Sequence, residues 1–410
     1  MSVHSDKYHK LKKLTDSKII EKLNSGYLVS NIENDNLYEV FIFNSKEGTC
    51  ERISLKKLKY VIKDFDKKYT VNYLPFRFRP DLDSGIISYG DDFIFNTYQS
   101  ASWRRIEKPD YIELIEIYSD FLDHLTANDL DSKEYILDWL AVSLKPDLYL
   151  PFLTLIGNRG VGKGILSEIV GALHGASNYT LLTQRVFNSQ FNDQLKDKTF
   201  AYLDEIKLDT HHQHNKLKLL INRDMEIEGK NVSAQTVRNY CKVMIASNNQ
   251  NAISISQADR RFSIPELSDL DLVNNTELML KYGSANAYHA ALLDPHNISS
   301  LGYFLEERYK NISRDMTKHF VSNNSVSVFA ATLSSWEDFL FKKLLEITPE
   351  DSSESFAITD IQNMIMSEFP KLRQPPGRVK LQEFCDKFSR NAKWHIKEGV
   401  QTLTFRSTKK

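Results

Sequence analysis

The stretch LTLIGNRGVGKGILSEIVGALHG, residues 153–175, decides the fold prediction. It begins as a short apolar strand, passes through a glycine-rich turn and continues as a helix with apolar residues every three or four positions. Gly157, Gly160 and Gly162 permit a tight loop whose backbone N–H groups converge on phosphate oxygens. Lys163 follows at the positive end of the helix dipole. The pattern predicts a phosphate-binding loop within an α/β protein.

The position after this lysine departs from the usual form of such loops, which carry Ser or Thr where this chain has Gly164. The missing hydroxyl normally binds Mg²⁺, and water would fill its place because Mg²⁺ usually keeps several waters. The way in which the metal is held is therefore open. The residues expected to contact the nucleotide are Gly157, Asn158, Arg159, Gly160, Val161, Gly162, Lys163, Gly164 and Ile165.

Two later apolar stretches end in polar side chains of the kind that nucleotide chemistry uses. FAYLDE, residues 200–205, ends in Asp204 and Glu205, and KVMIASNN, residues 242–249, contains Asn248. In open α/β sheets, ligands bind at the carboxyl ends of the strands. We expect Asp204 to hold Mg²⁺, Glu205 to orient and deprotonate the attacking water, and Asn248 to sense the γ-phosphate. An ordinary strand-end acidic pair and a turn asparagine are the alternatives when each motif is taken alone.

Arg260 and Arg261 in ADRRF, residues 258–262, are candidates for an arginine finger. Such a residue acts on the nucleotide of a neighbouring subunit, so it implies a ring. A surface salt bridge is the alternative for either arginine taken singly.

Composition places the chain among ordinary globular proteins, with 41% apolar and 26% charged residues. A length of 410 residues is enough for two or three domains. The three cysteines are widely spaced and form no CxxC pair, which fits a reducing compartment and excludes a disulfide framework. The first residues lack the apolar core of a signal peptide, and no run of 18 apolar residues occurs. We expect a soluble, intracellular protein.

Apolar periodicity divides the chain into regions. Residues 1–108 mix short strand-like runs with a basic amphipathic stretch, which predicts a small α+β domain. A helical lead-in follows over residues 109–146, and its first helix is predicted over 111–125. Residues 147–330 begin with alternating strands and helices, which predicts a parallel α/β core, and residues 266–334 are predicted to be mostly helical. Within them begins a Ser- and Asn-rich stretch, residues 321–335, that is typical of a linker.

The last region, residues 331–410, predicts three helices followed by a hairpin, which is the layout of a winged helix. A polar loop is predicted over residues 348–355. From Lys371 onward, eleven Lys and Arg face three Asp and Glu, so an anionic partner such as DNA is expected. The residues expected near DNA are Arg378, Lys380, Lys387 and Arg390 on the recognition helix and Lys393, Lys397 and Arg406 on the wing. A winged-helix module for protein contacts is the alternative.

The order of these motifs resembles the superfamily 3 helicases of the AAA+ class, in particular the helicase part of phage and plasmid primase-helicases. The resemblance covers about residues 110–265. It is carried by ILDWLAVSL, GNRGVGKG, FNSQFNDQLKDKTFAYLDE, LKLLINRDMEIEGKNVSAQTVRNYCKVMIASNN and DRRF. FNTY, residues 95–98, also looks like a phrase found upstream of this domain in such proteins.

This resemblance implies an AAA+-type P-loop ATPase core that binds ATP and Mg²⁺ and assembles as a homo-oligomer, a hexamer encircling single-stranded DNA. In that family a hairpin between the acidic pair and the asparagine strand projects into the channel. The matching basic residues here are Lys230, expected at the tip, Arg238 and Lys242. Phosphate-directed cations suit a nonspecific translocating contact. Solvated surface charges are the alternative.

Together these features predict an ATP-dependent replicative DNA helicase of a phage, plasmid or other mobile element, located in the cytoplasm of a bacterial host. The basic C-terminal region would recognise double-stranded origin DNA, and a separate primase or polymerase is an expected partner. The N-terminal domain is expected to serve oligomerisation or DNA entry. One alternative is a nucleotide-regulated origin-binding protein with little unwinding activity. A small-molecule phosphotransferase is another, but it gives the hairpin, the asparagine strand and the two arginines no role.

Two further motifs give only weak evidence of function. Asp81 and Asp83 in RPDLDSG have the D-x-D spacing of a two-metal polymerase site, but a proline precedes them and a turn is expected. The first 108 residues are also too few for such a domain, so we expect no primer synthesis. The histidines of DTHHQHNK lack a carboxylate or cysteine at a ligand-like spacing, so an exposed segment is expected rather than a metal site.

Overall fold

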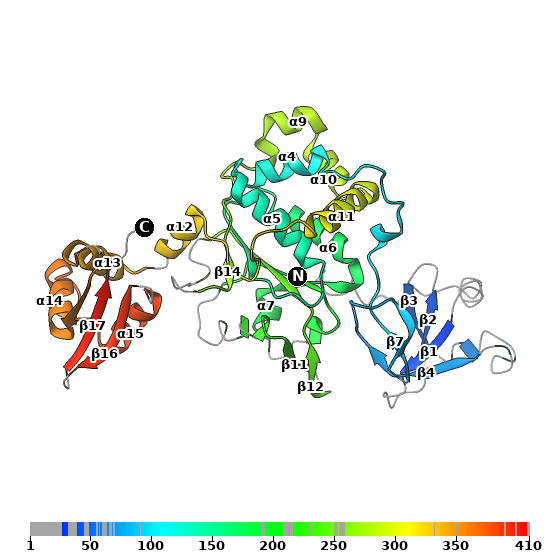
Figure 1. Ribbon diagram of the computed structural model, residues 1–410, viewed down its shortest axis with the longest axis horizontal. Helices are drawn as coiled ribbons and strands as arrows, with labels where there is room; N and C mark the ends of the chain where they lie inside the picture. Colours follow the sequence, from blue (N-terminus) through cyan, green and yellow to red (C-terminus); the bar gives the residue numbers. More distant parts are fainter. Residues whose placement is uncertain are drawn as a thin grey trace.

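The chain folds into a central α/β unit with a smaller, strand-rich unit before it and another unit after it (Figure 1). The computed structural model describes residues 27–31, 39–44, 49–54, 70–90, 92–189, 193–207, 219–229, 232–249, 259–331, 333–349, 351–388, 391–397 and 400–407, with isolated positions between them. Within these residues, no helix is both long and apolar enough to span a membrane.

The central unit is built on a five-stranded sheet with the strand order β14-β8-β13-β10-β9. Its strands are β8 (Phe152–Ile156), β9 (Tyr179–Thr183), β10 (Phe200–Asp204), β13 (Lys242–Ser247) and β14 (Phe262–Ser263). Every neighbouring pair is parallel. All residues of β8 and β13 are buried, as expected for parallel strands covered on both faces. All carboxyl ends therefore lie at one edge of the sheet.

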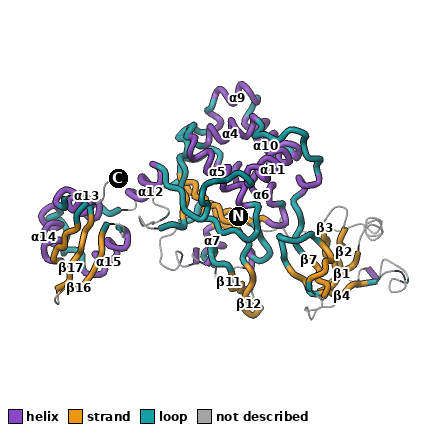
Figure 2. The backbone as a smooth tube through the Cα atoms, viewed as in Figure 1, coloured by secondary structure: helices purple, strands orange, loops and turns teal. Residues whose placement is uncertain are grey.

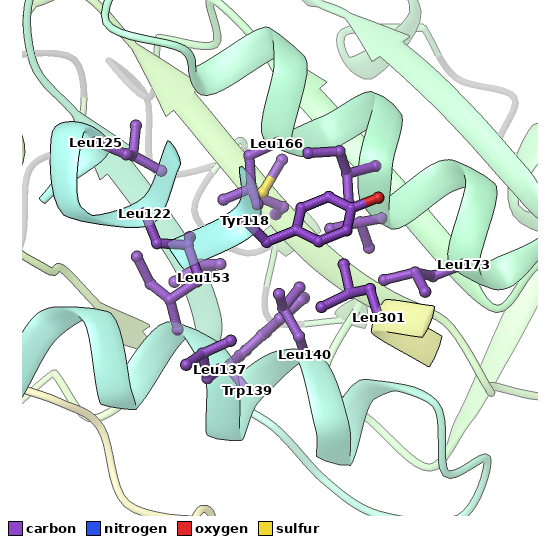
Figure 3. Packing of buried hydrophobic residues seen from close by; sticks show 14 of the residues in the cluster. Tyr118, Leu122, Leu125, Leu137, Trp139, Leu140, Leu153, Leu166, Leu173 and Leu301 are labelled. Atoms are coloured by element: carbon purple, nitrogen blue, oxygen red, sulfur yellow. The ribbon is translucent and has the colours of Figure 1, made fainter. Parts of the chain in front are cut away.

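Helices cover one face of this sheet and form the larger hydrophobic core. They are α4 (Glu116–Leu125), α5 (Leu130–Ser143), α6 (Lys163–His174), α9 (Thr276–Tyr282), α10 (Ala285–Leu292) and α11 (Pro295–Tyr309). In Figure 3, Leu153 of β8 lies among Leu137, Leu166 and other apolar side chains of these helices. Short 3-10 turns precede or follow some of them: η1 (Ser102–Arg105) lies before α4, η2 (Ala176–Asn178) after α6, and η5 (Leu272–Asn274) before α9. This packing fixes the start of α6 against the end of β8.

The first helix of the lead-in is shorter than predicted. It begins at Glu116, whereas a helix was expected from Tyr111. Tyr111 is 75% exposed, so its apolar ring contributes no burial that would hold an extra helical turn on the core.

The opposite face of the sheet carries a second core and the antiparallel hairpin of β11 (Asp224–Gly229) and β12 (Val232–Arg238). Both tube and ribbon views place this hairpin on the side of the unit away from α4, α9 and α10 (Figure 2). Among the described residues, α7 (Gln184–Phe187) and η3 (Asp193–Leu195) also contribute to this second core. The sequence therefore correctly indicated a hairpin between β10, which ends in Asp204, and β13, which precedes Asn248.

The described residues of the N-terminal unit form two small sheets. The first has the order β3-β2-β1-β4, and the second has the order β5-β7-β6. Their strands are β1 (Tyr27–Asn31), β2 (Glu39–Asn44), β3 (Thr49–Ser54), β4 (Val71–Leu74), β5 (Phe76–Arg77), β6 (Gly85–Tyr89) and β7 (Asp92–Asn96). Buried Asn96 donates to the carbonyls of Arg79, Leu82 and Asp83, which closes RPDLDSG into the expected turn.

The C-terminal unit contains α13 (Ser335–Ile347), α14 (Ile358–Glu368) and α15 (Arg378–Lys387), followed by the hairpin of β16 (Ala392–Lys397) and β17 (Val400–Arg406). A further strand, β15 (Ser353–Ala357), pairs with β17, so residues 353–355 form a strand and not the predicted loop. The sequence gives no strand signal there because the first three residues are polar and exposed. Backbone pairing with β17 and a hydrogen bond between the Ser355 and Thr404 hydroxyls hold them.

The stretch predicted as a linker contains a helix, α12 (Asn323–Ala331). Val328 is fully buried in the second core, and the Asn324 amide donates to the carbonyls of Ile156 and Pro265. Phe329 meets Phe388 of the C-terminal unit edge to face, with ring centroids 5.2 Å apart. These contacts order a Ser- and Asn-rich segment whose composition alone favours a loop.

Candidate functional site

Polar side chains from three neighbouring strands meet at the carboxyl edge of the central sheet. The glycine-rich loop joins β8 to α6, and β13 and β10 follow β8 in the sheet. They border an open cleft of about 500 Å³. Its lining includes Arg159, Gly160, Gly162, Lys163, Gly164, Ile165, Tyr202, Asp204, Glu205 and Asn248. Of the fourteen lining residues, nine were singled out from sequence, and Ser167, Glu168, Tyr179, Leu181 and Tyr202 were not.

Lys163, the first residue of α6, lies buried at the base of this cleft. Its ammonium donates to the carbonyls of Gly157 at 2.8 Å and Asn158 at 2.6 Å, and to Oδ1 of Asn248 at 2.8 Å. Burial lowers the pKa of Lys163, and the carboxylates of Glu205 and Asp204 oppose this shift. All three donors of the ammonium are thus bound to oxygens that phosphate oxygens can replace.

Glu205 and Asn248 form a pair across the cleft, because the Asn248 amide donates to Oε1 of the glutamate. Glu205 has a φ of 52°, in the left-handed region that non-glycine residues seldom adopt. Strained backbone of this kind concentrates at functional sites. Glu205 directly follows β10, and its carboxylate lines the cleft.

Asp204 is hydrogen-bonded to a residue of its own strand, Tyr202. The buried Tyr202 hydroxyl donates to Oδ1 of Asp204 at 2.9 Å, and the Asp204 carboxylate itself is exposed. Burial, together with the charges of Asp204 and Glu205, raises the pKa of Tyr202, so its hydroxyl remains a donor. The sequence signal for Tyr202 was its position two residues before Asp204, which places both side chains on one face of the strand.

The glycines of the loop differ in what their environment permits. Gly160 and Gly162 have φ values of 79° and 109°, and a Cβ on Gly160 would lie 2.2 Å from Oδ2 of Asp271. Gly164 has ordinary helical backbone, and a Cβ there would meet nothing within 4 Å. Open space beside Gly164 and the exposed Asp204 oxygens suit a hydrated Mg²⁺, which takes oxygen ligands and retains water. The site therefore fits a magnesium ion, with Asp204 as its protein carboxylate.

A segment after β14 packs over the loop, and no motif in the sequence indicated it. The Asn158 amide donates to Oδ1 of Asp269 at 3.2 Å, and the Leu272 N–H donates to the Gly160 carbonyl at 3.0 Å. Leu267 packs beside Gly157, which explains why a side chain is disfavoured at that position. This segment holds the loop in shape from a distance of more than 100 residues along the chain.

Arg260 and Arg261 lie at the other edge of the sheet, immediately before β14. Because β14 and β8 are parallel, this is the amino edge, away from the cleft of the same chain. Arg261 pairs with Asp259, its Nε lying 2.7 Å from Oδ1, whereas Arg260 is exposed. Neither arginine therefore completes the site of its own chain, and Arg260 is the better candidate for action on a neighbour.

The basic residues proposed for the hairpin are placed differently from one another. Lys230 lies outside the described residues. Arg238 ends β12, at the base of the hairpin, and pairs with Asp147 at 2.9 Å. Lys242 does not belong to the hairpin: it begins β13, is 6% exposed, and donates to the Pro146 carbonyl at 3.0 Å. The expectation that Lys242 contacts DNA is wrong, because its ammonium is enclosed by protein.

The basic residues of the C-terminal unit also divide into two groups. Arg378, Lys380 and Lys393 are exposed. Lys387 instead donates to both oxygens of the buried Glu337, at 2.8 and 3.0 Å, and so ties α15 to α13. The expectation that Lys387 faces DNA is therefore wrong. Arg390 lies outside the described residues, and of Lys397 only the backbone position at the end of β16 is described.

No group of three or more His, Cys, Asp or Glu suited to a metal occurs among the residues that the structure describes. Of the three histidines in DTHHQHNK, His211, His212 and His214, none belongs to that part of the chain.

Comparison with known proteins adds one family match and one relative. Residues 155–261 match a family of unknown function, DUF5906. The DNA primase-polymerase of Nitratiruptor phage NrS-1 is 26% identical over 190 residues, which cover 42% of this chain and 26% of the relative. The chain thus matches about a quarter of the length of this curated relative.

Solved structures extend the likeness in fold to nearly the whole chain. The apo structure of the NrS-1 C-terminal region superposes with a TM-score of 0.66 at 16% identity, covering 95% of this chain and 98% of that one. Its A form gives the same TM-score, with 96% and 99% covered. The chain is therefore similar in sequence to a phage DNA primase-polymerase, and similar in fold to the solved NrS-1 C-terminal region.

Proposed function

We propose that the chain is an ATP-dependent, ring-forming DNA helicase of superfamily 3 that serves the replication of a phage or other mobile element. The observation that carries this proposal is the convergence of Lys163, Asp204, Glu205 and Asn248 on one cleft beside a glycine-rich loop. In the proposal, the central unit is an AAA+-type P-loop ATPase core and the C-terminal unit is a winged helix.

Each residue of the cleft has a role in this reaction. The loop N–H groups and the Lys163 ammonium bind the phosphates of ATP, and the Lys163 contacts to the Gly157 and Asn158 carbonyls give way to phosphate oxygens. Bound with ATP, Mg²⁺ would neutralise phosphate charge, with Asp204 as its protein ligand. Glu205 takes a proton from the attacking water, and Asn248 holds Glu205 in place while its other end bonds Lys163.

The DNA partner is supported by the relative's activity and by the distribution of exposed cations. The relative is a DNA primase-polymerase, and the C-terminal unit presents Arg378, Lys380 and Lys393 to solvent. In a ring, the hairpin of β11 and β12 would face single-stranded DNA, and Arg260 would reach the neighbour's cleft. A primase or polymerase working beside the ring completes the replication role.

ATP hydrolysis with and without single-stranded DNA tests the proposal, together with displacement of a labelled strand from a forked duplex. We expect DNA to stimulate hydrolysis and Lys163→Ala to abolish both activities. Lys310→Ala, which removes an exposed lysine at the end of α11, is the matched control and should retain them. Equal, DNA-independent hydrolysis by wild type and Lys163→Ala would exclude the helicase.

Gly164 favours a second candidate, a nucleotide-regulated DNA-binding protein that does not unwind DNA. The loop lacks the hydroxyl that usually binds Mg²⁺, which weakens the support for rapid hydrolysis. ATP-dependent binding of duplex DNA without stimulated hydrolysis or strand displacement would favour this candidate over the helicase.

A further inference from the structure

Tyr202 is a buried side chain in the cleft that the proposed reaction leaves without a role. It is 5% exposed and lies on β10, two residues before Asp204. Side chains two apart on a strand point to the same face, so the phenol and the carboxylate lie side by side. The hydroxyl donates to Oδ1 of Asp204 at 2.9 Å.

This hydrogen bond fixes how Asp204 presents its second oxygen. β10 is paired on both sides, with β13 and with β9, so the backbone of Tyr202 and Asp204 is held in register. The phenol is packed in the same core as α6 and cannot follow a rotating carboxylate. Binding of Oδ1 therefore restrains the rotation of the Asp204 carboxylate, which lines the cleft.

Such orientation matters more here than in a loop with a serine or threonine after the lysine. Gly164 has no side chain, so this position supplies no side-chain oxygen. Its backbone is helical, and the space beside it is open. Ser167, which also lines the cleft, gives its hydroxyl proton to the Gly164 carbonyl at 2.7 Å and is held along its own helix. The metal affinity of the cleft thus depends strongly on Asp204.

We propose that Tyr202 is a positioning residue that orients Asp204 as a magnesium ligand and so compensates for the missing hydroxyl at Gly164. This inference rests on the proposed function, because it assumes that the cleft binds ATP with Mg²⁺. Removing a hydrogen-bonding partner of a metal ligand typically weakens metal affinity about 10- to 100-fold.

Tyr202→Phe tests this role, because it deletes only the hydroxyl. We expect the affinity for Mn²⁺ in the ADP complex, measured by electron paramagnetic resonance as free Mn²⁺ disappears, to fall about 10-fold. Binding of a fluorescent ATP analogue in EDTA should change less than twofold. Tyr118→Phe is the matched control, since that buried hydroxyl donates to the Leu292 carbonyl in the helical core and its loss should leave Mn²⁺ affinity unchanged.

A double-mutant cycle separates positioning from general loosening of the fold. If Tyr202 acts through Asp204, Tyr202→Phe should have no further effect on Mn²⁺ affinity once Asp204→Asn has been introduced. Additive losses in the double variant would overturn the inference, because they would place the effect of Tyr202 elsewhere.

Failure of this inference differs from failure of the proposed function. If wild type binds the ATP analogue and Mn²⁺ but Tyr202→Phe keeps full Mn²⁺ affinity, the positioning role is refuted and the ATP site stands. If wild type binds neither, the ATP site itself is refuted, and the positioning role with it.

Discussion

Lys163 and Lys242 lie at opposite edges of the central sheet, and they differ in whether a ligand can reach them. Lys163 and Lys242 are almost equally buried, at 8% and 6% exposure, and burial lowers the pKa of both. Lys163 faces a cleft in which two carboxylates favour its charge. Lys242 is enclosed at the amino edge, where its ammonium meets backbone carbonyls. The end of the strand at which a lysine lies therefore decides whether it is open to a ligand.

The largest effect is expected at the open edge. Glu205→Gln should lower ATP hydrolysis about 10²- to 10⁴-fold, the usual contribution of a general base, while ATP binding persists. Steady-state hydrolysis and equilibrium binding of a fluorescent ATP analogue measure the two quantities. Glu354→Gln, on the exposed strand β15, is the control and should leave both unchanged. Loss of binding in Glu205→Gln would assign this carboxylate to nucleotide contact and not to water activation.

At the closed edge, Lys242 should make stability depend on pH. Burial lowers its pKa from 10.5 to about 8. Below pH 8 the lysine is therefore charged in both states, and the buried charge destabilises the native state relative to the unfolded state. The native state loses this proton before the unfolded state does as the pH rises. The lysine's contribution to the free energy of unfolding should therefore increase by about 2 kcal/mol between pH 7 and pH 9.5.

Urea unfolding of wild type and Lys242→Met over that pH range measures this contribution. The difference between the two proteins should change with pH, whereas Lys310→Met, at an exposed position, should follow wild type throughout. Parallel pH profiles for wild type and Lys242→Met would show that the buried lysine does not titrate in this range.

Two glycines of the phosphate-binding loop should differ in how much an alanine substitution changes stability. Gly160→Ala places a Cβ against the Asp271 carboxylate and forces a left-handed backbone, which should cost about 1–2 kcal/mol of stability. Gly164→Ala meets open space in a helix and should add roughly 0.5–1 kcal/mol. Thermal unfolding of both variants checks this difference. If Gly164→Ala is the more destabilising substitution, position 164 has a constraint that its surroundings do not reveal.

The smallest effect is expected for single cations of the C-terminal unit. Lys393→Ala should reduce the salt dependence of duplex DNA binding by about one unit of slope, because one phosphate contact is lost. Lys387→Ala should leave that slope unchanged and lower stability instead, since it removes the positive charge that pairs with the buried Glu337 carboxylate. Fluorescence anisotropy across a salt series gives the slopes. An effect of Lys387→Ala on the slope would return this residue to the DNA-facing surface.

The sequence predicted the cleft better than it predicted the surfaces. Glycine spacing and the polar ends of apolar strands depend on local chemistry, so Lys163, Asp204, Glu205 and Asn248 were found together. Lys242 was misplaced because a basic residue at a strand start has the same sequence pattern whether it is buried or exposed. The segment around Asp271 was missed because its contacts with the loop join residues more than 100 positions apart in the sequence. Tyr202 was missed because its spacing to Asp204 places both side chains on one face of the strand but does not reveal the hydrogen bond between them.

Binding of ATP to variants of the two lysines tests the central claim most directly. Isothermal titration with Mg²⁺-ATP should show binding by wild type and by folded Lys242→Met, and no binding by Lys163→Met. Equal affinity of Lys163→Met and wild type would contradict the account, because the carboxyl edge of the sheet would then not be the ATP site.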